Sequence, residues 1–165
     1  MFADGRAKRS VLFLLIIITA CSKSSQPTEI AAGAVAVTQS LPKLPGGPSW
    51  NIEMVGANAV GERKSFDVPS QDKFAIVGWA VDQKAMAPAG GVEGVVDGVP
   101  YPAEYGRPRP DVAKVFGVPS YANSGYSLQL SGQLFAPGTH SLFIRVLTQD
   151  RKAYWEVGPY TLNLK

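Results

Sequence analysis

Few side chains in this 165-residue chain are of the types that activate a nucleophile or bind a metal ion. The only cysteine is Cys21 and the only histidine is His140, so a zinc site built from several cysteines and histidines is excluded. His140 follows the turn-like string APGT, where an edge or turn histidine is a simpler interpretation than a general base. No serine lies in a G-x-S-x-G nucleophile elbow. We therefore predict no catalytic residue, no metal site and no cofactor.

Carboxylates are the remaining candidates for chemistry, because glycoside hydrolysis uses two acids about 5 to 10 Å apart. Each candidate has a structural explanation. Asp82 ends an apolar run, Asp97 stands in a turn, and Asp111 lies in the first turn of a predicted helix. Glu93 is expected on the solvent side of a strand, and Glu104 follows it in the next run. We expect a protein that is not an enzyme, with a glycoside hydrolase as the alternative.

Aromatic and planar polar side chains gather in one stretch of the sequence. Rigid rings beside such groups suit a sugar face or a partner protein, because each ring gives contact area at a small entropic cost. The alternative is that the tyrosines pack this stretch onto the domain, with Tyr126 in the core, and that the two arginines pair with Glu104 and Asp111. The candidate binding residues are Tyr101, Tyr105, Arg107, Arg109, Tyr121 and Asn123.

The elements that must position these side chains are short and extended. Beyond Trp50, runs of alternating or β-branched apolar residues are separated by clusters of glycine, proline, asparagine and aspartate, which is typical of β-strands. The run KFAIVGWAVD at 73–82 is apolar on both faces and predicts a central, covered strand. The pair Asp97-Gly98 lies between two valine-bearing arms and predicts a β-hairpin.

One short helix is predicted in RPDVAKVFG. Pro110 suits the first helical position, and Gly117 can end the helix. The apolar residues Val112, Val115 and Phe116 fall on one face at three- and four-residue spacing.

These elements predict an all-β fold for residues 49–165. We expect an immunoglobulin-like antiparallel β-sandwich of about seven strands, with the short helix in a crossover loop. The cysteine pair of antibody domains is absent, and Trp79 is predicted to be the core aromatic in its place.

The charge of the chain argues against a nucleic-acid partner. The formal net charge is +3, from 16 basic and 13 acidic residues, but three basic residues and one acidic residue lie within residues 1–20. The remaining 13 basic and 12 acidic side chains nearly balance. Phosphate contacts need clustered lysine and arginine, so this body lacks the expected electrostatic footprint.

The first twenty residues have the organisation of an export signal. Arg6, Lys8 and Arg9 precede the apolar block Val11–Ile18, and small residues follow it. The block is too short for a transmembrane helix, which needs about 20 apolar residues. We predict that residues 1–20 are a signal peptide and that the body is extracytoplasmic.

The residues Ile18-Thr19-Ala20-Cys21 resemble the lipobox of bacterial lipoproteins. The resemblance implies that the chain is cleaved after Ala20 and that Cys21 receives diacylglycerol, with a further acyl group such as palmitate on the new amino terminus. Two or three acyl chains hold a soluble domain firmly on a membrane. In a Gram-negative cell, Ser22 after the cysteine implies outer-membrane delivery.

Residues 21–48 are predicted to be the lipidated cysteine and a flexible linker, because they are rich in serine, alanine, glycine and proline. Residues 73 to 147 resemble a β-sandwich module of bacterial cell-envelope proteins, most specifically in RPDVAKVFG and NSGY. This module also occurs at the extracytoplasmic ends of polytopic membrane proteins that resemble envelope-glycan glycosyltransferases. The resemblance implies a non-catalytic binding or assembly module for an envelope protein or glycan, the alternative being an enzyme acting on envelope polysaccharide.

Overall fold

The computed structural model describes residues 37–165. The predicted signal peptide, the lipobox with Ala20 and Cys21, and the first part of the predicted linker lie outside the described residues. No helix in the described part of the chain is both long enough and apolar enough to cross a membrane.

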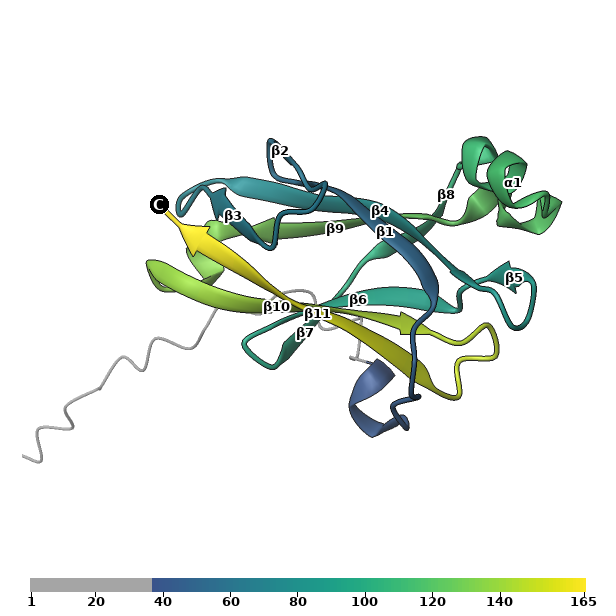
Figure 1. Ribbon diagram of the computed structural model, residues 1–165. Coiled ribbons are helices and arrows are strands. Elements are labelled where there is room, and N and C mark those ends of the chain that lie inside the picture. Colours follow the sequence, from purple (N-terminus) through teal and green to yellow (C-terminus); the bar gives the residue numbers. More distant parts are fainter. Residues whose placement is uncertain (1–36) are drawn as a thin grey trace, which may run out of the picture. The chain divides into compact units, whose positions relative to one another are not determined.

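Two β-sheets pack face to face in residues 37–165 (Figure 1). The first has the order β2-β1-β4-β9-β8, with β5 paired to β4, and the second has the order β3-β11-β10-β6-β7. The pairing of β3 with β11 is parallel, and the other pairings are antiparallel. The all-β sandwich predicted from the sequence is confirmed. The strands are β1 (Ser49–Val55), β2 (Asn58–Ala59), β3 (Ser65–Val68), β4 (Lys73–Asp82), β5 (Ala87–Pro88), β6 (Gly91–Val96), β7 (Val99–Pro102), β8 (Glu104–Arg107), β9 (Gly125–Ser131), β10 (Gly138–Leu147) and β11 (Tyr154–Leu164).

The core lies between the two sheets and follows the alternation of the strands. Leu142, Ile144 and Val146 of β10 are fully buried, and residues at alternate positions of the other strands meet them. Burying each such side chain contributes about 1.5–3 kcal/mol relative to exposure. As predicted, β4 is a central strand, between β1 and β9. Further core residues are Ile52, Val55, Phe66, Ile76, Leu128, Leu130 and Leu162.

The predicted hairpin at Asp97-Gly98 is present. Val96 and Val99 are paired across the turn between β6 and β7. Both turn residues have positive φ, 47° for Asp97 and 84° for Gly98, as a two-residue turn of this type requires.

The predicted helix is α1 (Pro110–Phe116), and it covers one end of the outer face of the first sheet (Figure 1). Gly117 ends the helix in the left-handed conformation, at φ 65°. The predicted apolar face is only partly correct, because Val112 is 3% exposed whereas Val115 is 82% exposed.

Trp79 was predicted to be the core aromatic, but it does not lie in the core between the two sheets. Its ring contacts the ring of Phe116, with 5.5 Å between centroids, in a second cluster beneath α1 that also includes Val81 and Val112. The reason is that β4 is covered on both faces, so an apolar residue of this strand can be buried on either one. Trp50 and Tyr160 pack together in the main core instead.

Residues 37–48, here called the strap, contact the outer face and edge of the second sheet. The strap begins with the 3-10 helix η1 (Val37–Ser40). Its backbone pairs with the start of β11, where the Leu44 amide donates to the Tyr154 carbonyl at 2.8 Å and the Tyr154 amide to Pro42 at 3.1 Å. Composition alone predicted a linker up to residue 48, whereas residues 37–48 are part of the packed domain.

Candidate functional site

The segment from β8 to β9 holds most of the predicted binding residues. It comprises β8, α1 and the 3-10 helix η2 (Pro119–Asn123), and it connects the edge strand β7 of the second sheet to β9 of the first. Within it, Arg109 is an anchor. Its backbone amide donates to the Ala122 carbonyl at 2.6 Å, which ties the start of α1 to η2.

The Arg109 guanidinium is occupied by two carboxylates. Nη1 and Nη2 donate to the two oxygens of Glu53 at 2.9 and 2.8 Å, and Nε and Nη2 donate to those of Asp111 at 2.9 and 2.6 Å. Hydrogen bonding to Asp111 is the main reason that the pKa of Arg109 is raised, and the same contact lowers the pKa of Asp111 to about 2. Arg109 therefore joins α1 to β1, and its donors face protein acceptors.

Tyr105 is held by its hydroxyl group. The hydroxyl donates to the Ala80 carbonyl at 2.6 Å and accepts from the Ala89 amide at 2.8 Å, which links β8 to β4 and β5. Burial raises the pKa of Tyr105 to about 12. Its polar end is thus used within the domain.

The other tyrosines are separated from one another. Tyr121 is 1% exposed in the cluster under α1, and Tyr126 is 1% exposed in the main core, as predicted for Tyr126. Tyr101 lies in the other sheet, on β7, where its ring contacts that of Phe135 with 5.8 Å between centroids. The rings do not form one continuous platform.

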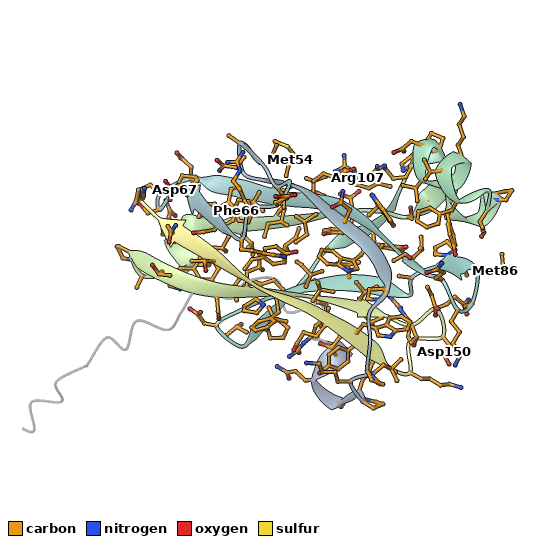
Figure 2. All side chains as sticks on the ribbon, viewed as in Figure 1. Met54, Phe66, Asp67, Met86, Arg107 and Asp150 are labelled. Atoms are coloured by element: carbon orange, nitrogen blue, oxygen red, sulfur yellow. The ribbon has the colours of Figure 1, made fainter. Side chains whose placement is uncertain are left out.

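Arg107 and Asn123 are the two exposed members of the predicted set, and neither side chain has a hydrogen bond or ion pair with another described residue (Figure 2 for Arg107). Arg107 borders a shallow hollow of about 220 Å³ on the first sheet. Its walls also include Glu53, Arg109 and Gly125. Among the described residues, the hollow therefore has one unpaired cation, Arg107, beside the ion pair of Arg109 with Glu53.

A larger hollow of about 370 Å³ lies between the turn that joins β4 to β5 and the turn that joins β10 to β11. Leu44 and Trp155 contribute apolar surface, and Lys84, Gln149 and Asp150 contribute polar groups. This hollow could not be predicted from the sequence, because its walls come from three separate segments of the chain.

The acids considered for glycoside hydrolysis are engaged in the fold. Asp82 is 5% exposed and accepts from the backbone amides of Ala85 and Gln149, both at 3.0 Å. Glu93 was predicted to face solvent, and this prediction is wrong. Its side chain is 2% exposed and accepts a hydrogen bond from Thr38 of the strap. The prediction failed because the strap covers this side of the sheet.

Two important partners were missed at the sequence level. Glu53 pairs with Arg109, 56 positions away in the sequence, and Arg145 lies directly opposite Glu93 on the neighbouring strand. Alternation within each strand indicates that these residues share a face with polar neighbours, but only the register between strands brings them together.

His140 has both ring nitrogens in hydrogen bonds. Nδ1 lies 2.6 Å from Asp97 Oδ2, and Nε2 lies 2.8 Å from the carbonyl oxygen of Ala136. A carbonyl oxygen and an ionised carboxylate both accept, so this geometry fits an imidazolium that donates twice. The hydrogen bond with Asp97 is the main cause of a raised pKa for His140 and of a lowered pKa for Asp97. His140 thus links the loop before β10 to the β6–β7 turn.

We expect the His140–Asp97 pair to make stability depend on pH. A histidine with a raised folded pKa stabilises fully below its unfolded pKa of about 6.5, and this contribution is lost as pH rises through the folded pKa. The lowered pKa of Asp97 has its effect at acidic pH. The stability that the Asp97 carboxylate contributes is lost as pH falls through its pKa in the folded state. Urea unfolding of wild type and His140→Asn should therefore differ most between about pH 5 and 6.5 and less at pH 9. A difference that is constant over this range would contradict the assignment.

The predicted binding residues thus divide into structural and available groups. Arg109, Tyr105 and Tyr121 fix the segment from β8 to β9, here called the crossover, to the rest of the domain. Arg107 and Asn123 of the same segment are exposed. No protein-family model and no curated protein sequence matches this chain.

Proposed function

We propose that this protein is a bacterial lipoprotein whose β-sandwich is held outside the cytoplasm by lipid on Cys21. The observation that carries the proposal is the lipobox-like Ile18-Thr19-Ala20-Cys21, placed directly after an apolar block that is too short to span a bilayer. Cleavage falls after Ala20, and the acylated cysteine becomes the first residue of the mature chain. In a Gram-negative cell, the lipid is inserted in the outer membrane.

The domain on this anchor is immunoglobulin-like in our proposal. What supports it is the strand order: β1-β4-β9-β8 corresponds to A-B-E-D, and β11-β10-β6 corresponds to G-F-C. Seven strands then take the immunoglobulin positions, and β2, β3, β5 and β7 are short additions.

The domain acts as a binding or assembly module of the cell envelope, with an envelope protein or a glycan as its partner. A binding role is supported over a catalytic one by the side chains that could do chemistry. The polar atoms of His140, Asp97 and Asp82 form hydrogen bonds within the domain. Arg107 and Asn123 remain exposed on the crossover and are the residues that contact the partner.

Replacing Cys21 with serine should abolish lipid attachment, because a hydroxyl group does not replace the thiol as the acceptor of the diacylglyceryl group. We expect cells fed a labelled fatty acid to label the wild-type chain and not Cys21→Ser, and the variant precursor to keep residues 1–20. A Ser22→Ala variant serves as the control and should be labelled normally. Labelling of Cys21→Ser at the wild-type level would refute the anchor.

Replacing Arg107 with alanine should weaken partner capture without unfolding the domain, because its side chain is exposed and unpaired among the described residues. Crosslinking in intact cells followed by mass spectrometry identifies the captured partner. Arg63→Ala is the matched control, since Arg63 is an exposed arginine between β2 and β3. Equal capture by Arg107→Ala and Arg63→Ala would show that Arg107 does not contact the partner.

A further inference from the structure

Exposed apolar side chains gather at the end of the sandwich that carries α1. Met86 is 62% exposed, Val115 is 82% exposed and Phe116 is 36% exposed. Met86 lies in the turn between β4 and β5, at the same end as α1 (Figures 1 and 2). The Ser120 hydroxyl donates to the Met86 carbonyl at 2.8 Å, so this turn is tied to η2, which follows α1. These side chains therefore belong to one surface, here called the α1 end.

Cations surround these apolar side chains. Lys84 lies two residues before Met86, and Lys114 directly precedes Val115. Both are exposed, and neither forms an ion pair with any residue in the described range 37–165. Lys84 also lines the larger hollow.

The acids at the α1 end cancel these charges only in part. Asp111 at 2.6 Å and Glu53 at 2.8 Å share the single Arg109 guanidinium, so this cluster keeps one negative charge. Asp150, on the turn between β10 and β11, lies 4.0 Å from the ammonium of Lys152 (Figure 2). The preceding residue, Arg151, adds another exposed cation, whose Nε donates to the Gly90 carbonyl. Among the described residues, the five basic side chains at this end exceed the four acids by one: Lys84, Lys114, Arg109, Arg151 and Lys152 against Glu53, Asp82, Asp111 and Asp150. The α1 end is thus weakly positive and partly apolar.

We propose that the α1 end docks on an anionic lipid surface. Met86 and Val115 enter the boundary between headgroups and acyl chains, while Lys84 and Lys114 contact lipid phosphates. The Phe116 ring stays packed on Trp79 and Tyr121 and supports this surface from below. The charge at this end is complementary to that surface. The helix α1 and the turn before β5 lie at the same end of the sandwich (Figure 1), an arrangement that suits contact with a flat membrane.

This inference rests on the membrane location proposed above, and the chain is long enough to allow it. From Cys21 to Val37, about 16 residues can span at most roughly 55 Å. The longest strand, β11, has 11 residues, so this strand is about 36 Å long at about 3.3 Å per residue. Either end of the domain can therefore reach the membrane, and the side chains decide which end does.

The test uses the mature chain, residues 21–165, with Cys21→Ser, so that neither lipid attachment nor the basic and apolar residues 6–18 bind it to the vesicles. An environment-sensitive dye is attached to the single cysteine of Val115→Cys, or to that of the control Val99→Cys. Val99 is 52% exposed and lies on the β6–β7 hairpin, away from the α1 end. The chain is added to vesicles of phosphatidylcholine with or without phosphatidylglycerol.

We expect the dye at position 115 to brighten several-fold and shift to the blue with anionic vesicles, and the dye at position 99 to change little. Lys84→Glu with Lys114→Glu should abolish the response at 115, whereas Lys73→Glu, at the opposite end of β4, should retain it. An equal response at both positions, an equal response to neutral vesicles, or no response to either vesicle would overturn the proposal. Because the dye reports which end faces the lipid, these outcomes are independent of the result for Cys21.

Discussion

Replacing Gly78 with alanine is expected to destabilise the domain by about 3 kcal/mol or more, at the upper end of the cost of overpacking. A Cβ atom at position 78 would lie 2.0 Å from the carbonyl oxygen of Asn51 and 2.8 Å from the hydroxyl of Tyr126. The Asn51 oxygen belongs to the backbone of β1, which pairs with β4 at this point. It cannot move away unless the two strands separate, so the first sheet must distort.

The matched control is Gly47→Ala. Nothing lies within 4 Å of a Cβ atom built at Gly47, and its φ is not in the left-handed region. This variant should keep the wild-type stability or gain up to about 1 kcal/mol, because alanine reduces the entropy of the unfolded chain. Urea unfolding followed by near-ultraviolet circular dichroism measures both free energies. Similar unfolding midpoints for the two variants would show that β1 and β4 are not as close as described.

A second test separates the two contacts at Gly78. Tyr126→Phe removes the hydroxyl group and leaves the Asn51 carbonyl in place. If the backbone contact dominates, the double variant Gly78→Ala with Tyr126→Phe should be no more stable than Gly78→Ala. Recovery to the stability of Tyr126→Phe alone would assign the cost to the hydroxyl instead.

Local signals predicted the local structure of this protein. The Asp97-Gly98 turn and the helix that begins at Pro110 and ends before Gly117 were predicted because their backbone conformations depend on the residues themselves. The apolar run of β4 likewise predicted a central strand, and the alternation in β10 predicted which of its residues are buried.

What the sequence did not predict depends on contacts between distant segments. Trp79 was assigned to the core, but a strand covered on both faces gives no periodic signal for the face that meets the second sheet. Glu93 was assigned to solvent because its cover, Thr38, lies 55 positions earlier in a segment with the composition of a linker.

The candidate site shows the same division. The sequence placed six binding candidates in one stretch, but the chain passes from β7 of one sheet to β8 of the other within that stretch. Tyr101 and Tyr105 therefore belong to different sheets, although four positions separate them. Arg107 is available and Arg109 is not, because Glu53 of β1 pairs with Arg109. Only the folded arrangement brings Glu53 and Arg109 together.

The second large effect is expected for Arg145→Met, on the outer face of the second sheet. Arg145 lies between Glu93 of β6 and Glu156 of β11, directly opposite both in the strand register. Its Nε donates to Glu156 at 2.8 Å, and its Nη1 donates to the Thr38 hydroxyl at 3.1 Å, which in turn donates to Glu93. Glu93 is 2% exposed, so loss of the facing cation cannot be compensated by water.

We expect Arg145→Met to lower the free energy of unfolding by about 3–5 kcal/mol, because the buried Glu93 carboxylate loses the cation directly opposite it and Glu156 loses one of its two ionic partners. Replacing Glu93 with methionine in the same chain should recover much of this loss, since replacement of both members of a buried pair by apolar residues is often neutral. Arg63→Met, at an exposed position, controls for the loss of an arginine. Urea unfolding of wild type, Arg145→Met, Glu93→Met and the double variant gives the coupling energy between positions 93 and 145. If the two single effects simply add in the double variant, Arg145 does not balance Glu93, and the strap is held to the sheet by its backbone contacts at Tyr154 and by the ion pair between Lys43 and Glu156.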